Sequence, residues 1–362
     1  MPFLRHSLLA VAQLALVLGL AGTVASRPAD PAVAVSAHVA GSVRKPLKPQ
    51  ARPRPVSADP SLPNDPLWRD SWSLTKVRAP AAWKVTRGTA EIVVAVLDTG
   101  VDRSHPDLQG ALVEGWDAVN EDADPSDDHG HGTLVAGVVA ARSNNGIGGV
   151  GACSRCSVMP VKVIGANGSG TAADIAEGIV WAADHGARVI NMSFVMTGRD
   201  EEVASALEHA RSKGALIVAA AGNSGSADVT FPASEPGVVS VTGTDAADDR
   251  YSWANFGSWV TLAAPGCSPS TKAGGGYADF CGTSSAAAFA SGIAALARSA
   301  SVNAPTEQIV AAMASGAVRV GDFVATGRVD AAATTGTLSV SCCPPAPADS
   351  PLDRPEPHPN RL

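Results

Sequence analysis

The amino-acid sequence predicts an α/β protein: a three-layer, doubly wound, mostly parallel sheet with helices on both faces. Continuous apolar, β-branched runs recur along the middle of the chain, as in strands that are buried on both faces. Helical patterns lie between these runs, and this alternation favours parallel strands joined by right-handed crossovers. Of the 362 residues, 45% are apolar and 17% are charged, which allows a large core and excludes a chain that is disordered throughout.

The expected elements follow in chain order. Strands are predicted at residues 91–97 (EIVVAVL), 157–164 (SVMPVKVI), 187–192 (ARVINM), 215–219 (ALIVA) and 237–242 (GVVSVT). Helices are predicted at residues 132–141, 171–185 and 200–213. Active residues of a parallel sheet gather at the carboxyl ends of its strands, so the residues that follow these runs are candidates for a functional site.

The two ends of the chain differ from its middle. In residues 1–25, Arg5 precedes the apolar run 8–20, which is typical of a secretory signal; a membrane anchor is the alternative if cleavage fails. Residues 26–60 are Pro-rich and basic, which indicates a linker or a short pro-segment, and residues 341–362 are expected to be a Pro-rich disordered tail. Residues 61–340 then form the folded domain of an exported protein, secreted or periplasmic, with no membrane contact after signal cleavage.

Composition excludes several other classes of protein. The net charge of −7 argues against a nucleic-acid-binding protein, which would carry a basic stripe. Six cysteines in 362 residues are too few for a fold that is held together mainly by disulfides, as small secreted domains are. No period of about 20–50 residues repeats, which excludes solenoids and propellers.

Three segments carry the groups that nucleophilic catalysis needs. Asp98 ends the first predicted strand (VLDTGVD), His131 opens a helix (HGHGTLVAG), and Ser284 opens another (CGTSSAAAFASG). A serine hydroxyl is a poor nucleophile without a base, so His131 would take the proton of Ser284 and Asp98 would orient the imidazole. Asn223 follows a buried strand and would donate its amide to an oxyanion, together with the backbone N–H of Ser284.

Each motif also has a simpler interpretation when it is taken alone. An Asp before Thr-Gly is usually a turn residue, a Ser at a helix start is usually an N-cap, and an Asn before Ser-Gly is usually part of a loop. His129 and His131 could be metal ligands, but no third His or Cys lies in a neighbouring motif. Residues 165–170 (GANGSG) suggest a dinucleotide loop and an oxidoreductase, but their glycine spacing does not match G-x-G-x-x-G.

Taken together, the motifs resemble those of the subtilisin-like serine proteases, and most closely the thermitase-type branch. The order Asp, His, Ser is that of subtilisin itself. The resemblance covers about residues 63–335 and includes residues 63–66 (PNDP), 98–108 (DTGVDRSHPDL), 144–151 (NNGIGGVG), 219–223 (AAAGN) and 327–331 (GRVDA). It implies a secreted, monomeric serine endopeptidase that cleaves proteins or peptides through an acyl-enzyme, without an organic cofactor. A binding protein built on an inactive protease scaffold is the alternative.

The resemblance also implies where a peptide substrate would bind. An extended peptide would add as a strand between Gly168, Ser169 and Gly170 on one side and Ser193, Phe194 and Val195 on the other. Ala221, Gly222 and Asn223 would line the pocket for the residue before the cut, and their small size would leave room for a sizeable apolar side chain.

The chain departs from the family in places. The family usually has Leu-Gly-Gly after Ser193, so the bulkier Phe194, Val195 and Met196 are expected to narrow or reshape the cleft. Ser285 stands where the family usually has Met, which removes a sulfur that could be oxidised.

Structural calcium is the cofactor that the resemblance implies. Residues 114–128 contain seven acids and no Lys or Arg, which by themselves could form a solvated acidic loop. Their spacing matches a thermitase-like calcium loop, with ligands at Asp117, Asn120, Asp122, Asp124 and Ser126. A second site is implied at Asp65, Asp107 and Asn145, with the carbonyls of Ile147 and Gly149.

Export would permit disulfides, although six cysteines allow 15 pairings. Cys267 and Cys281 flank a predicted hairpin that leads to Ser284, and Cys153 and Cys156 can pair across a tight turn. Cys342 and Cys343 are adjacent in the tail and would be unpaired or intermolecular.

Overall fold

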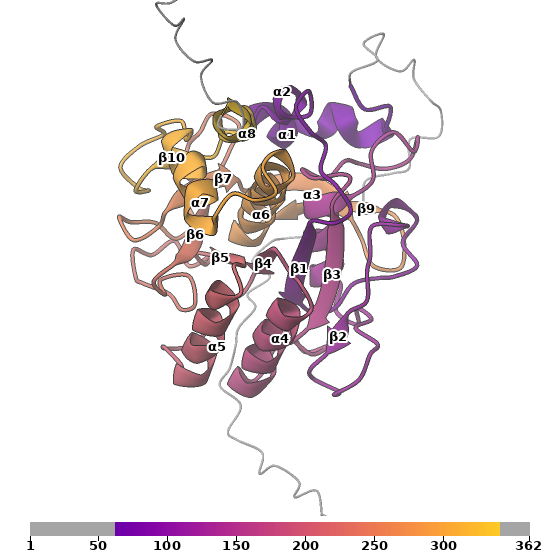
Figure 1. Cartoon of the computed structure of the whole chain (residues 1–362), viewed down its shortest axis with the longest axis vertical. Helices are drawn as coiled ribbons and strands as arrows, with labels where there is room; N and C mark the ends of the chain where they lie inside the picture. The colour runs from indigo at the N-terminus through magenta and orange to yellow at the C-terminus, as the bar shows by residue number, and fades with distance from the viewer. Residues whose placement is uncertain (1–61, 341–362) are drawn as a thin grey trace, which may run out of the picture. The chain divides into compact units, whose positions relative to one another are not determined.

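The structure of the protein, a computed structural model, describes residues 62–340. The predicted secretory signal, linker and tail lie outside the described residues, as do Cys342 and Cys343. Figure 1 shows the described part, in which a sheet runs between two layers of helices.

Eight strands form the central sheet in the order β10-β7-β6-β5-β4-β1-β3-β2, and all neighbouring strands pair in parallel. They are β1 (Val93–Asp98), β2 (Trp116–Asp117), β3 (Ser157–Lys162), β4 (Val189–Met192), β5 (Leu216–Ala220), β6 (Val238–Thr244), β7 (Leu262–Pro265) and β10 (Gly327–Arg328). A separate antiparallel hairpin consists of β8 (Cys267–Thr271) and β9 (Tyr277–Cys281).

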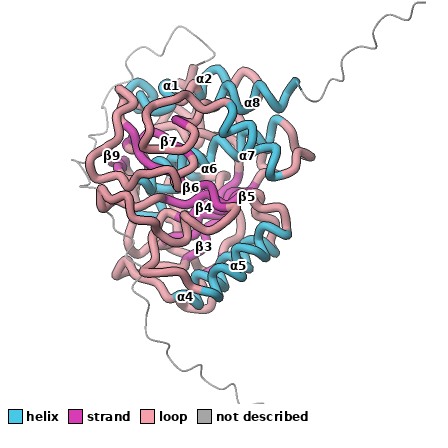
Figure 2. Tube along the Cα trace, turned by 90° about the vertical axis from the view of Figure 1, so that its left-hand side faces the viewer, coloured by secondary structure: helices cyan, strands magenta, loops and turns pink. Residues whose placement is uncertain are grey.

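Helices cover both faces of the sheet, which confirms the predicted three-layer, doubly wound fold. Helices α4 (Ala172–Asp184) and α5 (Glu201–Ser212) pack side by side on one face, and α3 (His131–Ala140) and α6 (Thr283–Ala300) pack on the other. Figure 2 shows the strands enclosed between these two layers. The remaining helices are α1 (Trp72–Lys76), α2 (Ala79–Ala82), α7 (Thr306–Ser315) and α8 (Ala331–Val340), with 3-10 turns η1 (Pro66–Asp70) and η2 (Pro106–Leu108).

A hydrophobic core lies on each face of the sheet, and the strands contribute to both because they are apolar on both faces. In β1, Val94 and Val96 join the core under α3 and α6, whereas Ala95 and Leu97 join the core under α4 and α5. Helix α6 is buried along nearly its whole length, and its many alanines let it lie close to the sheet.

β1 lies where the chain order of the strands reverses. The chain passes from β1 to β3 on one side and then to β4 on the other side of β1. In doubly wound sheets, ligands bind at the carboxyl ends of the strands that flank such a point. Asp98 is the last residue of β1 and therefore lies at the position where the topology favours a site.

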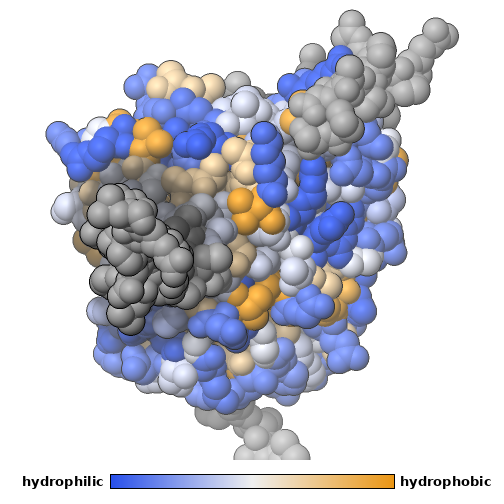
Figure 3. Space-filling model, turned by 45° about the horizontal axis from the view of Figure 1, so that its top comes forward, coloured by the Kyte–Doolittle hydropathy of each residue, from blue (hydrophilic) through white to orange (hydrophobic). Residues whose placement is uncertain are grey.

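One face of the described part is mixed in character. Figure 3 shows one face, on which hydrophobic residues form small, separate patches among hydrophilic ones. None of the helices within residues 62–340 combines the length and the hydrophobicity that crossing a bilayer requires.

Candidate active site

Asp98 and His131 are in contact at the carboxyl end of β1. His131 is the first residue of α3, and its Nδ1 lies 2.7 Å from Oδ1 of Asp98. Both side chains are buried, and the same Asp98 oxygen accepts the backbone N–H of Thr99 at 2.8 Å. The structure thus joins two predicted site residues that are 33 positions apart in the sequence.

The pKa of His131 is raised above its ordinary value. Burial by itself would lower this pKa, but the charge and the hydrogen bond of Asp98, with a further contribution from the charge of Asp127, outweigh burial. A neutral imidazole that directs Nδ1–H to Asp98 presents Nε2 as a base. Phe280 of β9 packs edge-on against the imidazole, with ring centroids 5.4 Å apart and planes at 79°.

Asp127 anchors the start of α3, although its sequence context marks it only as one of the seven acids of residues 114–128. Its Oδ1 accepts the N–H of Gly130 at 2.7 Å and the hydroxyl of Thr99 at 2.8 Å. Its Oδ2 accepts the N–H and the hydroxyl of Thr133 at 2.9 and 2.5 Å. A carboxylate here satisfies N–H groups that the first turn of a helix leaves without partners. Asp127 thereby fixes the position of His131.

Lys162 of β3 is buried beside the same loop. Its Nζ donates to Asp128 Oδ1 at 2.6 Å and to the carbonyls of Thr99 and Ile164 at 3.0 Å each. A buried lysine needs such partners, and here they join the ends of β1 and β3 to the loop that precedes His131. The available sequence signal was a single lysine within an otherwise apolar strand.

Ser284 is the second residue of α6 and is buried next to the end of β4. In the described part of the chain its hydroxyl donates to the carbonyl of Ser193 at 3.1 Å rather than to His131. Ser193 is held in turn by the side chain of Asn191, which donates to its hydroxyl at 2.9 Å. Ser291 of α6 donates to Asn191 at 2.9 Å, so polar contacts fix the end of β4 against α6.

Asn223 follows β5 and is oriented by Thr283. Its Oδ1 accepts the N–H of Thr283 at 2.8 Å and the hydroxyl of Thr283 at 2.9 Å, which turns its Nδ2 to the opposite side. A Cβ built on Gly282 would lie 3.6 Å from both Asn223 Nδ2 and the backbone nitrogen of Ser284. Two N–H donors therefore flank a space that glycine leaves open, and Gly282 also has a φ of +143°, which favours glycine.

Comparison with known proteins identifies the family that carries this arrangement. Residues 89–337 match the family model of the subtilases. The chain belongs to the subtilase family. It is a serine-type endopeptidase, and the predicted resemblance is confirmed.

Similar proteins agree with this assignment. The chain is 39% identical over 274 residues to thermitase of Thermoactinomyces vulgaris, a match that covers 74% of this chain and 97% of thermitase. It is 40% identical over 264 residues to a thermophilic serine proteinase of Bacillus sp. strain AK1, a match that covers 72% of this chain and 66% of that protein. A solved protease structure from Pseudoalteromonas arctica superposes with a TM-score of 0.73 at 32% identity, and covers 77% of this chain and 100% of its own.

The residues expected to bind substrate lie after β3 and β4, on either side of β1. Gly168, Ser169 and Gly170 belong to a turn in which the N–H of Gly165 donates to the carbonyl of Ser169 at 2.9 Å. A Cβ on Gly170 would lie 2.1 Å from the carbonyl oxygen of Val163, so this backbone approach requires glycine.

The pocket residues of the subtilase differ from the expectation in two respects. Ala221 does not line the cavity beside Ser284, because it packs in a small core cluster with Val260 and Ala263. The cavity has a volume of about 10 Å³, which holds about one water molecule. In this structure the cavity is thus too small for the sizeable apolar side chain that was expected. It is lined by Ser193, Phe194, Val195, Ala220, Gly222, Asn223, Thr283 and Ser284.

Asp65 and Asp107 are two buried carboxylates that interact with each other. Burial raises the pKa of both, and the nearby charge of Asp65 helps to raise that of Asp107 to about 6. The side chain of Asn145 donates to Asp107 at 2.7 Å, and the N–H of Asn144 donates to Asp65 at 2.8 Å. Two buried carboxylates suit a hard divalent cation. Asn145 turns its N–H to Asp107, and its side-chain oxygen accepts the N–H of Ile147 at 3.1 Å. Calcium at these residues stays a prediction.

The acidic loop gathers its carboxylates less closely. Asp117 is buried and accepts the side-chain N–H of Asn120 at 2.8 Å, whereas Asp122 and Asp124 are exposed. The N–H of Asp124 donates to Asp122 at 2.8 Å, and the Ser126 hydroxyl donates to Asp124 at 2.6 Å. Among the described residues, no three His, Cys, Asp or Glu side chains come close enough to hold a metal. Calcium in this loop stays a prediction, and the structure gives no support to a histidine-based metal centre at His129 and His131.

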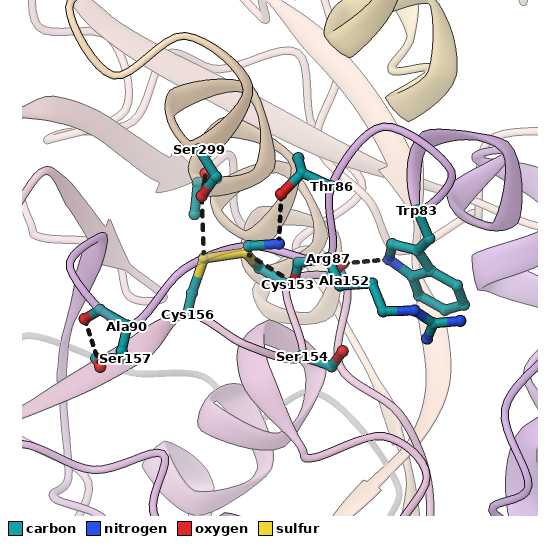
Figure 4. Close-up of a disulfide and its surroundings, with 12 residues drawn as sticks. Trp83, Thr86, Arg87, Ala90, Ala152, Cys153, Ser154, Cys156, Ser157 and Ser299 are labelled. Atoms are coloured by element: carbon teal, nitrogen blue, oxygen red, sulfur yellow. Dashed lines mark hydrogen bonds between the residues drawn. A yellow bond between two sulfur atoms is a disulfide. The ribbon is translucent and has the colours of Figure 1, made fainter.

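Two disulfides close turns in the subtilase, as their spacing suggested. Figure 4 shows the pair Cys153–Cys156 packed between the backbone near Arg87 and Ser299 of α6. A Cβ on Gly88 would lie 2.4 Å from the Cys153 sulfur, so the close approach of this segment depends on a glycine. The pair Cys267–Cys281 joins the ends of β8 and β9 just before α6 begins.

Proposed function

We propose that this subtilase is an exported, monomeric enzyme that cleaves proteins or peptides through an acyl-enzyme on Ser284. His131 would be the general base and then the general acid, and Asp98 would hold its tautomer and stabilise the imidazolium. Asn223 Nδ2–H and the backbone N–H of Ser284 would bind the oxyanion.

One contact supports this proposal more than any other: the 2.7 Å approach of His131 Nδ1 to Asp98 Oδ1 at the switch point of the sheet. A buried Asp next to a buried His raises the basicity of the imidazole, which is the property that a base for serine needs. The paired donors around Gly282 support the assignment of the oxyanion site.

The reaction would proceed in two stages. Ser284 Oγ leaves the Ser193 carbonyl and attacks the peptide carbon, while its proton passes to Nε2 of His131. The imidazolium gives this proton to the leaving nitrogen as the C–N bond breaks, and an ester with Ser284 remains. A water molecule then loses a proton to the same imidazole, and its oxygen attacks the ester carbon. The C–O bond to Ser284 breaks, and the imidazolium returns its proton to Ser284 Oγ.

Calcium is proposed as a structural ion. Asp65, Asp107 and Asn145 would hold one ion, and Asp117, Asp122 and Asp124 are the candidates for another. A cation that binds only the folded state stabilises that state. Export is supported by the two disulfides, which persist in oxidising compartments, and by the signal pattern of residues 1–25.

Labelling with a fluorophosphonate tests the proposed function. The reagent should modify the peptide that contains Ser284, and the variant Ser284→Ala should show neither labelling nor peptidase activity. Ser285→Ala is the matched control, because the buried hydroxyl of Ser285, next to Ser284 in the sequence, has no hydrogen-bond partner within residues 62–340. Folded protein that is not labelled and does not cleave peptides would instead support a binding function.

A further inference from the structure

The cavity beside Ser284 lies between two wall segments. One wall is residues 193–196, which follow β4, and the other is residues 220–223, at the end of β5 and beyond it. The residue before the cut supplies the carbonyl that Ser284 attacks, so in the proposed function its side chain enters the space between these walls.

Val195 reaches across this space to the opposite wall. Its neighbours Phe194 and Met196 are buried in the core under α4 and α5, so the side chain of Val195 points to the other side of its segment. A Cβ built on Gly222 would lie 3.3 Å from Cγ1 of Val195. The Cα of Gly222 is one C–C bond away from that Cβ position, so it lies at most about 4.8 Å from this methyl group of Val195.

This separation is too small for a large side chain. An aromatic ring between two walls needs about 3.5 Å to each, or about 7 Å between the wall atoms. The cavity volume of about 10 Å³ agrees with this limit.

Both walls are fixed, so the space cannot widen easily. In the first wall, the side chain of Asn191 donates to the hydroxyl of Ser193 at 2.9 Å, and the N–H of Met196 donates to the carbonyl of Phe231 at 2.8 Å. Val195 lies between these two anchored residues.

The second wall has anchors of its own. The side chain of Asn255 donates to the carbonyl of Ala221 at 2.9 Å, and the N–H of Gly222 donates to the hydroxyl of Thr283 at 3.1 Å. Widening the gap would therefore break buried hydrogen bonds, each of which is costly to leave unmade.

We propose that Val195 restricts this subtilase to cleavage after residues with small side chains, namely glycine, alanine and serine. The inference rests on the proposed function and adds the class of substrate. Val195 is a specificity-determining residue that excludes aromatic and long aliphatic side chains by occupying their space.

The test uses two chromogenic tetrapeptides that differ only in the residue before the cut, Ala or Phe. Wild-type enzyme should show a kcat/KM at least tenfold higher for the Ala substrate. Val195→Gly and Val195→Ala should raise kcat/KM for the Phe substrate by at least tenfold and should raise the Phe-to-Ala ratio of kcat/KM by at least tenfold. Val302→Ala, which truncates an exposed valine after α6, should leave both values unchanged.

A digest of denatured casein, read by mass spectrometry, gives an independent measure. Wild-type cuts should follow small residues, and cuts by Val195→Gly should include sites after Phe and Leu. A wild-type enzyme that cleaves after Phe as readily as after Ala overturns the inference, even if the variants fail to fold. Fluorophosphonate labelling of Ser284 separates the two hypotheses, because the proposed function fails only when folded wild-type protein is neither labelled nor active.

Discussion

Oδ1 of Asp98 contacts His131 Nδ1 at 2.7 Å, whereas Oδ2 of the same carboxylate is buried and has no hydrogen-bond partner among the described residues. The charge of Asp98 is therefore directed chiefly at one imidazole. A buried carboxylate arranged in this way favours protonation of the histidine and fixes the nitrogen that faces the substrate.

Asp98→Asn should abolish most of the activity without unfolding the protein. The amide keeps the shape of the side chain but favours the wrong imidazole tautomer, and in a comparable triad this lowers kcat by about 10⁴-fold. Steady-state kinetics measures the loss, and circular dichroism checks the fold. A loss of less than tenfold would contradict the role of Asp98.

The pH profile should show the raised pKa of His131. The protonated imidazole cannot accept the Ser284 proton, so kcat/KM should fall as the pH falls through this pKa, with a midpoint above about 6.5. Asp127→Asn removes one of the charges that raise the pKa, and its midpoint should therefore lie lower than that of wild type. Glu202→Gln, an exposed change at the start of α5, is a control that should not move it.

Asn223→Ala should lower kcat by about 10²–10³-fold with little change in KM, a magnitude that was established on subtilisin itself. Thr283→Val should give a smaller loss. It removes one of the two hydrogen bonds that orient Asn223, together with the acceptor of the Gly222 N–H, and leaves the backbone donor to Asn223 in place. Stopped-time assays with one peptide substrate compare both. If Asn223→Ala instead raises KM and leaves kcat unchanged, Asn223 contributes to binding of the ground state and not to the transition state.

Chelation of calcium should lower the melting temperature at pH 8 and have much less effect at pH 5. Without the ion, ionisation of Asp107 costs stability, because its folded pKa of about 6 lies above the ordinary value near 4. This cost is absent below about pH 4, grows between about pH 4 and pH 6 and is complete above that range, so relief by calcium is greater at pH 8 than at pH 5. Scanning calorimetry with and without EGTA measures it. The variant Asp107→Asn should respond less to EGTA than wild type, because it lacks this site and keeps the candidate site in the acidic loop.

Peroxide should inactivate the enzyme slowly, because Ser285 replaces the methionine that the family usually has beside the nucleophile. Ser285→Met restores the sulfur and should shorten the half-life of activity in peroxide. The methionines in the described part, among them Met192 and Met196, are buried and poorly accessible to the reagent. Rapid inactivation of wild type, with no oxidation elsewhere in the cleft, would refute this expectation.

The sequence predicted the regular elements well because their signal is local. All eight elements that were expected exist, and their ends differ from the structure by at most two residues. Helices α4 and α5 begin at the capping residues Thr171 and Asp200, which bond to the first backbone N–H groups. Strands β2, β7 and β10 and helices α1, α2, α7 and α8 were not predicted. Strands β2 and β10 have two residues each, which is too short to show a periodicity.

The site was predicted in part. Asp98, His131, Ser284 and Asn223 could be named because each lies in a distinctive motif at the end of a strand or the start of a helix. The supporting residues Asp127 and Lys162 could not be assigned, since their roles depend on partners in other loops. For the pocket, the small residues Ala221 and Gly222 suggested a wide space, whereas the bulky residues 194–196 suggested a narrowed cleft. The sequence could not show that Val195 alone of these three lies close to Gly222.

The amino-acid sequence by itself thus determined the main strands and helices and the chemical groups available for catalysis. Hydrophobic patterns and motifs are properties of residues that are close together in the sequence. Only the tertiary structure decided which oxygen faces the imidazole, which donors surround Gly282 and how much space the substrate has. Those features arise where loops from separate strands meet, and distances between such loops are set by packing and by hydrogen bonds across the whole domain.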